Sequence, residues 1–129
     1  MKKYFILAVI LFLPVFVKIY CFAASPIEKL ELSGKVENGI RIIEIKASQY
    51  KFDPDPIVVA LGEKVRLVVT SIDVEHGIAI SEFNVRLSIP AGKTESIEFV
   101  ADKKGHFHAF CSVYCGPGHG RMQANFIVE

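Results

Sequence analysis

Hydrophobic and polar residues alternate along most of the chain with a period of two, which is typical of strands with one buried face. The clearest example is KVRLVVT at 64–70, where Val65, Leu67 and Val69 share one side. After the first 24 residues, no window of 11 or more residues shows the periodicity of a helix. Further short runs of branched and aromatic residues predict strands at 40–45, 57–61, 78–80, 85–89, 96–100, 106–111 and 124–128.

Proline and glycine separate these runs at short intervals. Examples are the turn sequence DPDP at 53–56, Gly62, the sequence PAG at 90–92, and Gly105. Short strands joined by such turns predict an all-β fold, a β-sandwich with Greek-key connections. The sequence contains no internal repeat and no low-complexity tract.

The first 24 residues have a different character. Two lysines precede an uninterrupted apolar run at 4–17, and small residues follow it, which is the layout of a secretory signal peptide cut after Ala23. The alternative is one N-terminal hydrophobic helix at 4–24 that anchors the chain, since about 20 residues can cross a bilayer. Lys18 and Pro14 weigh against the anchor. Both interpretations place the remaining chain in the periplasm or on the outer face of the cytoplasmic membrane.

The chain is therefore expected to divide into a signal peptide or membrane anchor at 1–24, a polar linker at 25–39, and one β domain at 40–129. The leader contains three of the 15 basic residues, which leaves 12 basic residues against 14 acidic ones. A nearly balanced charge without a basic run excludes nucleic acid as an expected partner. The remaining length of about 105 residues is enough for one hydrophobic core.

Candidate chemistry is concentrated near the C-terminus, in CSVYCGPGHGRM at 111–122. Cys111, Cys115, His119 and Met122 follow the spacing Cys-x3-Cys-x3-His-x2-Met, and three glycines and a proline allow the loop to turn tightly. Thiolate, imidazole and thioether donors favour copper and disfavour calcium or magnesium. Zinc rarely uses a methionine. The loop thus predicts a copper site, and the alternative without a metal is a structural disulfide between the two cysteines.

The number of copper ions depends on Cys111. A mononuclear blue-copper site needs one Cys, two His and a weak Met, and Cys115, His119 and Met122 with one distant histidine would supply it. A second thiolate at Cys111 favours two bridged copper ions. The distant histidine is expected to be His76, which lies between two predicted strands, because loops at one end of a sandwich cluster in space.

Two further histidines, His106 and His108, lie two residues apart on a predicted strand and share one face. Cys111 is of opposite parity and projects from the other face. We therefore expect both histidines to be surface residues, or residues that support the ligands without binding the metal, and not ligands.

The same loop resembles the binuclear copper (CuA) loop of cytochrome c oxidase subunit II, and the copper domain of nitrous oxide reductase has a similar loop. The segment SIDVEH at 71–76 resembles the first-histidine motif of that family, and FDP at 52–54 and IPAGK at 89–93 resemble its framework. The similarity covers about residues 40–129 and implies a cupredoxin-like fold.

The resemblance also implies a ligand set. Cys111 and Cys115 would bridge two copper ions. His76 and Met122 would complete the coordination of one ion. His119 and the backbone carbonyl of Val113 would complete the other.

Three features depart from the usual subunit II. Val113 stands where an acidic residue is common, the chain contains no tryptophan, and at most one short hydrophobic segment replaces the common pair of transmembrane helices. None of these differences affects the expected ligands.

The functional hypothesis is an exported protein that relays single electrons between redox partner proteins, such as a cytochrome and an oxidase or reductase subunit. It would not be catalytic alone. The alternatives are an exported copper storage or delivery protein and a mononuclear blue-copper protein. Paired acids, a nucleophile triad and a phosphate loop are not apparent in the sequence.

Overall fold

The computed structural model describes residues 29–129, so the predicted signal peptide or anchor at 1–24 lies outside the described residues. Between residues 29 and 129 no helix is long and apolar enough to cross a bilayer. Ten strands and two short 3₁₀ helices form this part of the chain. The all-β prediction is confirmed.

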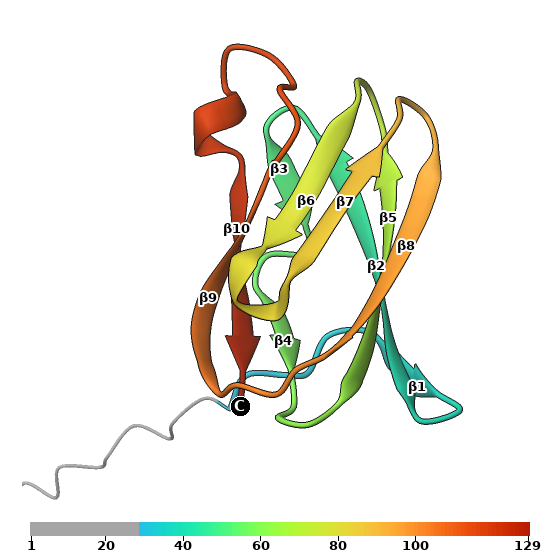
Figure 1. The fold of residues 1–129 in the computed structure, drawn as a ribbon, viewed down its shortest axis with the longest axis vertical. Helices are drawn as coiled ribbons and strands as arrows, with labels where there is room; N and C mark the ends of the chain where they lie inside the picture. The colour runs from blue at the N-terminus through green and yellow to red at the C-terminus, as the bar shows by residue number, and fades with distance from the viewer. Residues whose placement is uncertain (1–28) are drawn as a thin grey trace, which may run out of the picture.

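The strands form two sheets that face each other (Figure 1). The first sheet has the order β1 (Lys35–Glu37), β2 (Ile40–Ser48), β5 (Lys64–Ser71) and β8 (Thr94–Val100), with β3 (Lys51–Asp53) paired to β2. The second has the order β4 (Ile57–Val59), β10 (Gln123–Val128), β9 (Gly105–Phe110), β6 (His76–Ile80) and β7 (Val85–Ile89). Strands β2 and β5 pair in parallel, as do β10 and β4, which requires the chain to cross between sheets.

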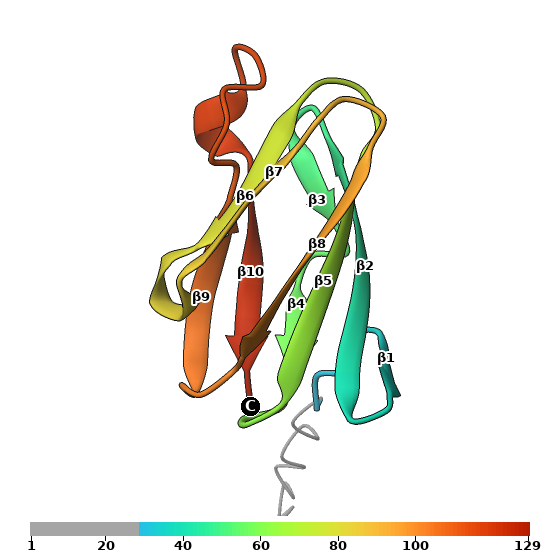
Figure 2. The same ribbon diagram turned by 45° about the vertical axis from the view of Figure 1, so that its right-hand side comes forward.

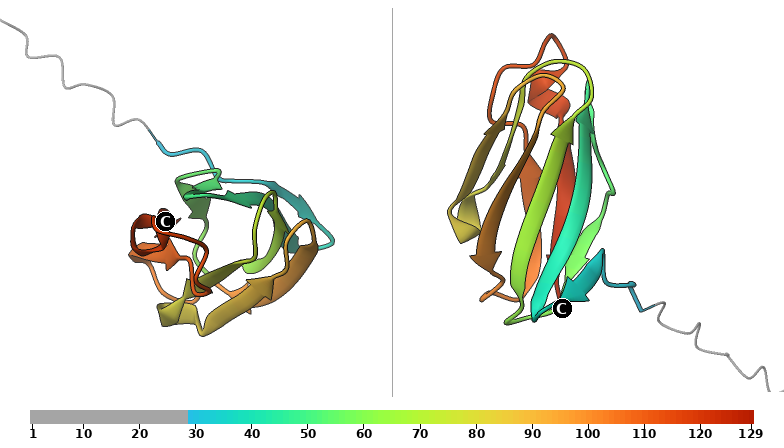
Figure 3. Two further views of the ribbon diagram at one scale, coloured as in Figure 1. Left: turned by 90° about the horizontal axis from the view of Figure 1, so that it is seen from above. Right: turned by 90° about the vertical axis from the view of Figure 1, so that its right-hand side faces the viewer.

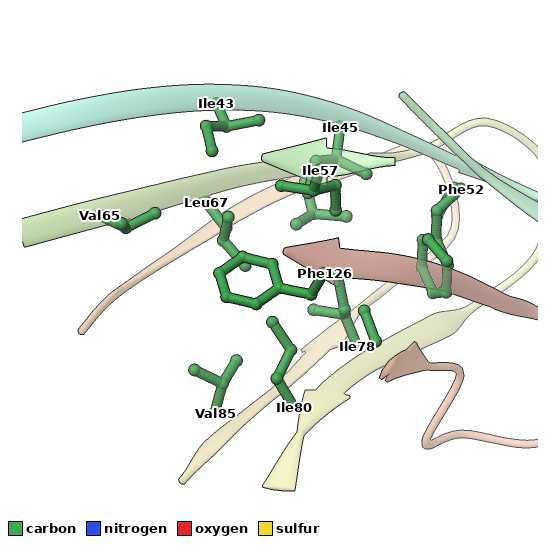
Figure 4. Close-up of a cluster of buried hydrophobic side chains, with 14 of the residues drawn as sticks. Ile43, Ile45, Phe52, Ile57, Val65, Leu67, Ile78, Ile80, Val85 and Phe126 are labelled. Atoms are coloured by element: carbon green, nitrogen blue, oxygen red, sulfur yellow. The ribbon is translucent and has the colours of Figure 1, made fainter. Parts of the chain in front are cut away.

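The buried side chains of the core come from both sheets and lie between them, and the view from above shows the two sheets enclosing this interior (Figure 3). Strand β5 buries every second residue, which is the alternation that predicted it. Phe126 of β10 is fully buried between branched side chains from both sheets, including Ile45, Leu67 and Ile80 (Figure 4). The interlocking of these side chains excludes water and fixes the register of both sheets.

Two strands were not predicted. Strands β1 and β3 have three residues each, and their sequences KVE and KFD offer at most one apolar side chain to the core. Both strands form by pairing with β2, and three residues are too few to show a clear alternation of apolar and polar positions. Strand β1 lies inside the segment expected to be a linker, and Ser33 just before it is held by Val58, whose backbone N–H donates to the Ser33 hydroxyl over 2.8 Å.

The loops that carry the candidate site gather at one end of the sandwich. The turns β2–β3, β5–β6 and β7–β8 and the long β9–β10 loop all lie at the upper end, and the C-terminus and β1 lie at the lower end (Figures 1 and 2). Backbone hydrogen bonds connect these loops, from Ile72 to the carbonyl of Ala47 and from Ser71 to the carbonyl of Lys93. The sheets thus form a rigid support under the loop at 111–122.

Candidate metal centre

The β9–β10 loop is closed at its neck by a hydrogen bond from the Cys111 amide to the Met122 carbonyl, 3.0 Å long. Inside the loop, the amide of His119 donates to the carbonyl of Gly116 and begins the 3₁₀ helix His119–Arg121, labelled η2. The amide of Met122 then donates to the carbonyl of His119. These turns direct the sulfur of Met122 and the imidazole of His119 toward the cysteines.

The two cysteine sulfurs lie at the centre of the predicted site. Cys111 Sγ and Cys115 Sγ are 3.5 Å apart, so they are close but unbonded, since a disulfide requires about 2.05 Å. His76 Nδ1 lies 3.9 Å from Cys111 Sγ. His119 Nδ1 and Met122 Sδ lie 3.6 and 3.7 Å from Cys115 Sγ. The disulfide alternative is absent from this conformation.

His76 is fully buried and its orientation is fixed by Asp73. The Asp73 Oδ1 atom lies 2.7 Å from His76 Nε2, which leaves Nδ1 directed toward the sulfurs. The other carboxylate oxygen accepts from the amide of Gln49 over 2.8 Å. Partial burial acts to raise the pKa of Asp73, but the hydrogen bonds from Gln49, His76 and the Val74 amide outweigh it and hold that pKa below its usual value. Asp73 therefore stays anionic and keeps the imidazole in one tautomer.

Val113 contributes through its backbone. Its carbonyl oxygen lies 3.1 Å from Cys111 Sγ, whereas His119 and Met122 contact Cys115 Sγ. The loop reaches this position because Gly77 on β6 has no side chain. A Cβ at that glycine would lie 2.3 Å from Ser112 Oγ and 3.0 Å from the Val113 nitrogen.

The structure thus brings together all six predicted ligand residues, His76, Cys111, Val113, Cys115, His119 and Met122. The donor atoms of His76, Cys111 and Cys115 lie within 4.8 Å of one another, and all three residues are buried. Their role as ligands stays a prediction. The other histidines behave as expected, because His106 and His108 are exposed on the opposite face of β9 from Cys111.

Two supporting residues were missed by the sequence reasoning. Gln49 and Tyr50 form the turn between β2 and β3, and Gln49 Nε2 donates to the Cys115 carbonyl over 2.8 Å. The Tyr50 ring lies under Gly118, where a Cβ would come within 2.3 Å of it. The only sequence signal for either residue is its position in a turn at the end of the sandwich that carries the ligand loop.

The donor set fits a soft metal ion. Burial and the neighbouring Cys111 raise the pKa of Cys115 to about 11, so the Cys115 thiol of the metal-free protein holds its proton at neutral pH. A buried thiol with this high pKa is poised to exchange its proton for a cation, because a metal stabilises thiolate in a site that water cannot solvate. Two sulfurs, two imidazole nitrogens and a thioether suit copper better than magnesium or calcium.

Comparison with known proteins identifies the family of this chain. The family profile described as the periplasmic domain of cytochrome c oxidase subunit II matches residues 25–128. Cytochrome c oxidase subunit 2 of Thermus thermophilus is 26% identical over 106 residues, covering 82% of this chain and 76% of that protein. Nitrous-oxide reductase of Cupriavidus necator is 32% identical over 102 residues, covering 75% of this chain but only 16% of the reductase.

A solved structure of a heme-copper terminal oxidase dimer contains a similar chain, with a TM-score of 0.65 and 28% identity. The match covers 82% of this chain and 76% of that one. The predicted cupredoxin-like fold and the predicted resemblance are both confirmed. The chain belongs to the family of cytochrome c oxidase subunit II periplasmic domains.

Proposed function

We propose that the chain is an exported electron-transfer protein whose six residues hold a binuclear, CuA-type copper centre. The observation that carries the proposal is the buried sulfur pair at 3.5 Å, surrounded by two imidazole nitrogens, a thioether and a backbone carbonyl. A mononuclear site needs only one thiolate, so two thiolates this close are best explained by bridging. The family consists of copper electron-transfer domains, which supports the redox role.

When bound, the two coppers would share the charge of one electron and so spread it over several ligands. The protein contributes rigidity. The Cys111–Met122 neck, the Asp73 bond to His76 and the Gln49 bond to Cys115 hold the donors at their positions before any metal arrives. A site with little freedom to rearrange undergoes small geometric change when its charge changes, which favours fast electron transfer.

The centre would exchange electrons with a protein partner, which is supported by a relative named as a subunit of cytochrome c oxidase and by a similar chain in a heme-copper terminal oxidase dimer. Residues 1–24 would export the domain or anchor it at the outer face of the cytoplasmic membrane. A cytochrome or an oxidase or reductase subunit is the expected partner class.

Copper loading of the purified domain tests the proposal directly. We expect two coppers per chain, a purple protein, and an electron paramagnetic resonance spectrum with seven hyperfine lines from one electron shared by two nuclei. Replacing Cys111 with Ser should abolish that spectrum. The matched control is His108→Ala on β9, the strand that leads into Cys111; His108 faces solvent, so this change should alter neither the copper count nor the spectrum.

Other outcomes discriminate the alternatives. One copper per chain with an intense blue band would refute the binuclear centre in favour of a mononuclear one. Tight binding of Cu(I) without a stable oxidised form would refute electron transfer in favour of copper storage or delivery.

A further inference from the structure

A hollow of about 470 Å³ lies against one side of the predicted centre. Its wall includes three of the predicted ligand residues, Cys111, His119 and Met122, and the remaining surface includes Arg86, Phe110 and Gln123. Strand β7 supplies Arg86, and the end of β9 supplies Phe110, which is exposed. The hollow therefore borders the predicted centre.

The charge of this hollow is one-sided. Arg86 is exposed at its edge, and Arg121, also exposed, lies in η2 between the lining residues Gly120 and Met122. No carboxylate lines the hollow. In the described part of the chain neither arginine forms an ion pair, whereas Arg41 and Arg66 each bind a glutamate.

Acidic groups at this end of the sandwich lie elsewhere. Asp73 and Glu75 are in the β5–β6 loop beside His76, and neither lines the hollow. Asp73 is already occupied by hydrogen bonds to Gln49, Val74 and His76. The His119 side of the centre is therefore cationic.

Apolar surface accompanies the two arginines. Tyr114 is 73% exposed at the tip of the loop, and its ring lies 5.7 Å from the ring of His119. Phe110 and Tyr114 are among the few large exposed apolar side chains of the described chain. An apolar contact area beside unpaired guanidinium groups is typical of a protein interface, where arginine and aromatic residues are enriched.

We propose that this hollow, with Arg86 and Arg121 beside it, is the docking surface for a redox partner protein with an acidic face. The proposal rests on the proposed function and names the partner chemistry for the same centre. Guanidinium groups bind carboxylates in paired hydrogen bonds, and both are free to do so. Opposite charges would steer the partner to the side where His119 and Met122 are nearest, and one electron would pass between the partner and the centre.

Small oxidants of opposite charge test the surface on the loaded, reduced protein. One electron leaves the reduced centre and converts hexacyanoferrate(III) to hexacyanoferrate(II), or tris(phenanthroline)cobalt(III) to cobalt(II). We expect the double substitution R86E/R121E to slow oxidation by the anion about tenfold at low salt and to remove its decline with ionic strength. Oxidation by the cation should become faster. The control K29E/K104E makes the same change in net charge away from the hollow and should change neither rate more than twofold.

Nuclear magnetic resonance on the copper-free protein provides a readout independent of the metal. Titration with a decaglutamate peptide should shift the amide signals of Arg86, His119 and Arg121, and titration with decalysine should leave them in place. If loading yields no binuclear spectrum, the proposed function fails and this titration still decides the docking surface. Shifts centred elsewhere, or anion kinetics unaffected by the arginine substitutions, would overturn the proposal. Shifts caused by phosphatidylglycerol vesicles and not by the peptide would overturn it in favour of a lipid surface.

Discussion

Replacing Gly118 with alanine tests how the ligand loop is held. A Cβ at Gly118 would lie 2.3 Å from Cδ2 of Tyr50 and 2.5 Å from both Cε2 and Cγ, where ordinary contacts are 3.4–4 Å. Either the tyrosine ring or the loop must therefore move by about 1 Å, and the loop carries the predicted ligands on both sides of this glycine. The ring is not free to yield, because Tyr50 packs against the hydrophobic core.

The cost follows from two opposing effects. Overpacking of this kind destabilises by about 1–3 kcal/mol, and the loss of chain entropy in the unfolded state returns about 0.4–1 kcal/mol. We expect Gly118→Ala to lower the free energy of unfolding by about 1–2 kcal/mol. Gly120→Ala is the matched control in the same loop, since a Cβ there meets no atom within 4 Å, and its effect should lie within about 0.5–1 kcal/mol of zero.

Urea unfolding of the reduced, copper-free protein, followed by circular dichroism, measures both changes at an unchanged slope. Combining Gly118→Ala with Tyr50→Ala completes a double-mutant cycle, and removing the ring should abolish the cost of the added methyl group. Equal stability of the two glycine variants, or a cost that persists without the ring, would refute the view that Tyr50 supports the loop.

Three further substitutions probe the frame of the protein, two beside the site and one at the opposite end of the sandwich. Gly77→Ala should drive Ser112 away from β6 and lower the copper content of protein loaded under fixed conditions, as measured by metal analysis, while the unfolding free energy falls by about 1–3 kcal/mol. Asp73→Asn should weaken copper binding about 10–100-fold in a chelator competition, because the imidazole loses its anionic acceptor. Glu63→Gln should cost about 2 kcal/mol at neutral pH by removing the two-pronged pairing with Arg41. The hydrogen bond from Arg41 holds the pKa of Glu63 below its ordinary 4.5. The stabilisation from this pair is therefore fully present above pH 4.5 and is lost as the pH falls through the lower pKa of the folded state. Acid unfolding of Glu63→Gln should not show this loss of stability.

The predicted ligand residues could be proposed from the sequence, and their proximity anticipated, because metal chemistry depends on the identity of side chains. Sulfur and imidazole donors are rare, so their concentration at 111–122 stands out, and the placement of His76 follows from the rule that sandwich loops cluster at one end. The structure brings His76 Nδ1 within 3.9 Å of a cysteine sulfur across 35 residues of sequence. Only the pattern of strands between them was needed to anticipate that approach.

The alternation of inward and outward positions along β9 explains the exposure of Phe110. The ring of Phe110 is 36% exposed, although Phe126 on the neighbouring strand β10 is fully buried. It shares parity with His106 and His108, which face solvent, whereas Ala109 and Cys111 point inward. Hydrophobic character alone favoured a buried Phe110, but the position of a side chain along a strand decides its face. The exposed ring instead borders the hollow beside the centre.

The supports of the site escaped prediction for a physical reason. The side-chain amide of Gln49 donates to the backbone carbonyl of Cys115, and Gly77 and Gly118 allow close approach because they have no side chain. Neither contribution can be recognised from residue type in the sequence. Both depend on distances between loops that are set by the packing of the two sheets, to within a few tenths of an ångström. A donor set can therefore be recognised from residue types, while the rigidity that would make it an efficient electron relay resides in contacts at Gly77, Gly118 and Tyr50. Substitutions at Gly118 and Tyr50 test this support of the loop without removing a predicted ligand, whereas Gly77→Ala is expected to lower the copper content as well.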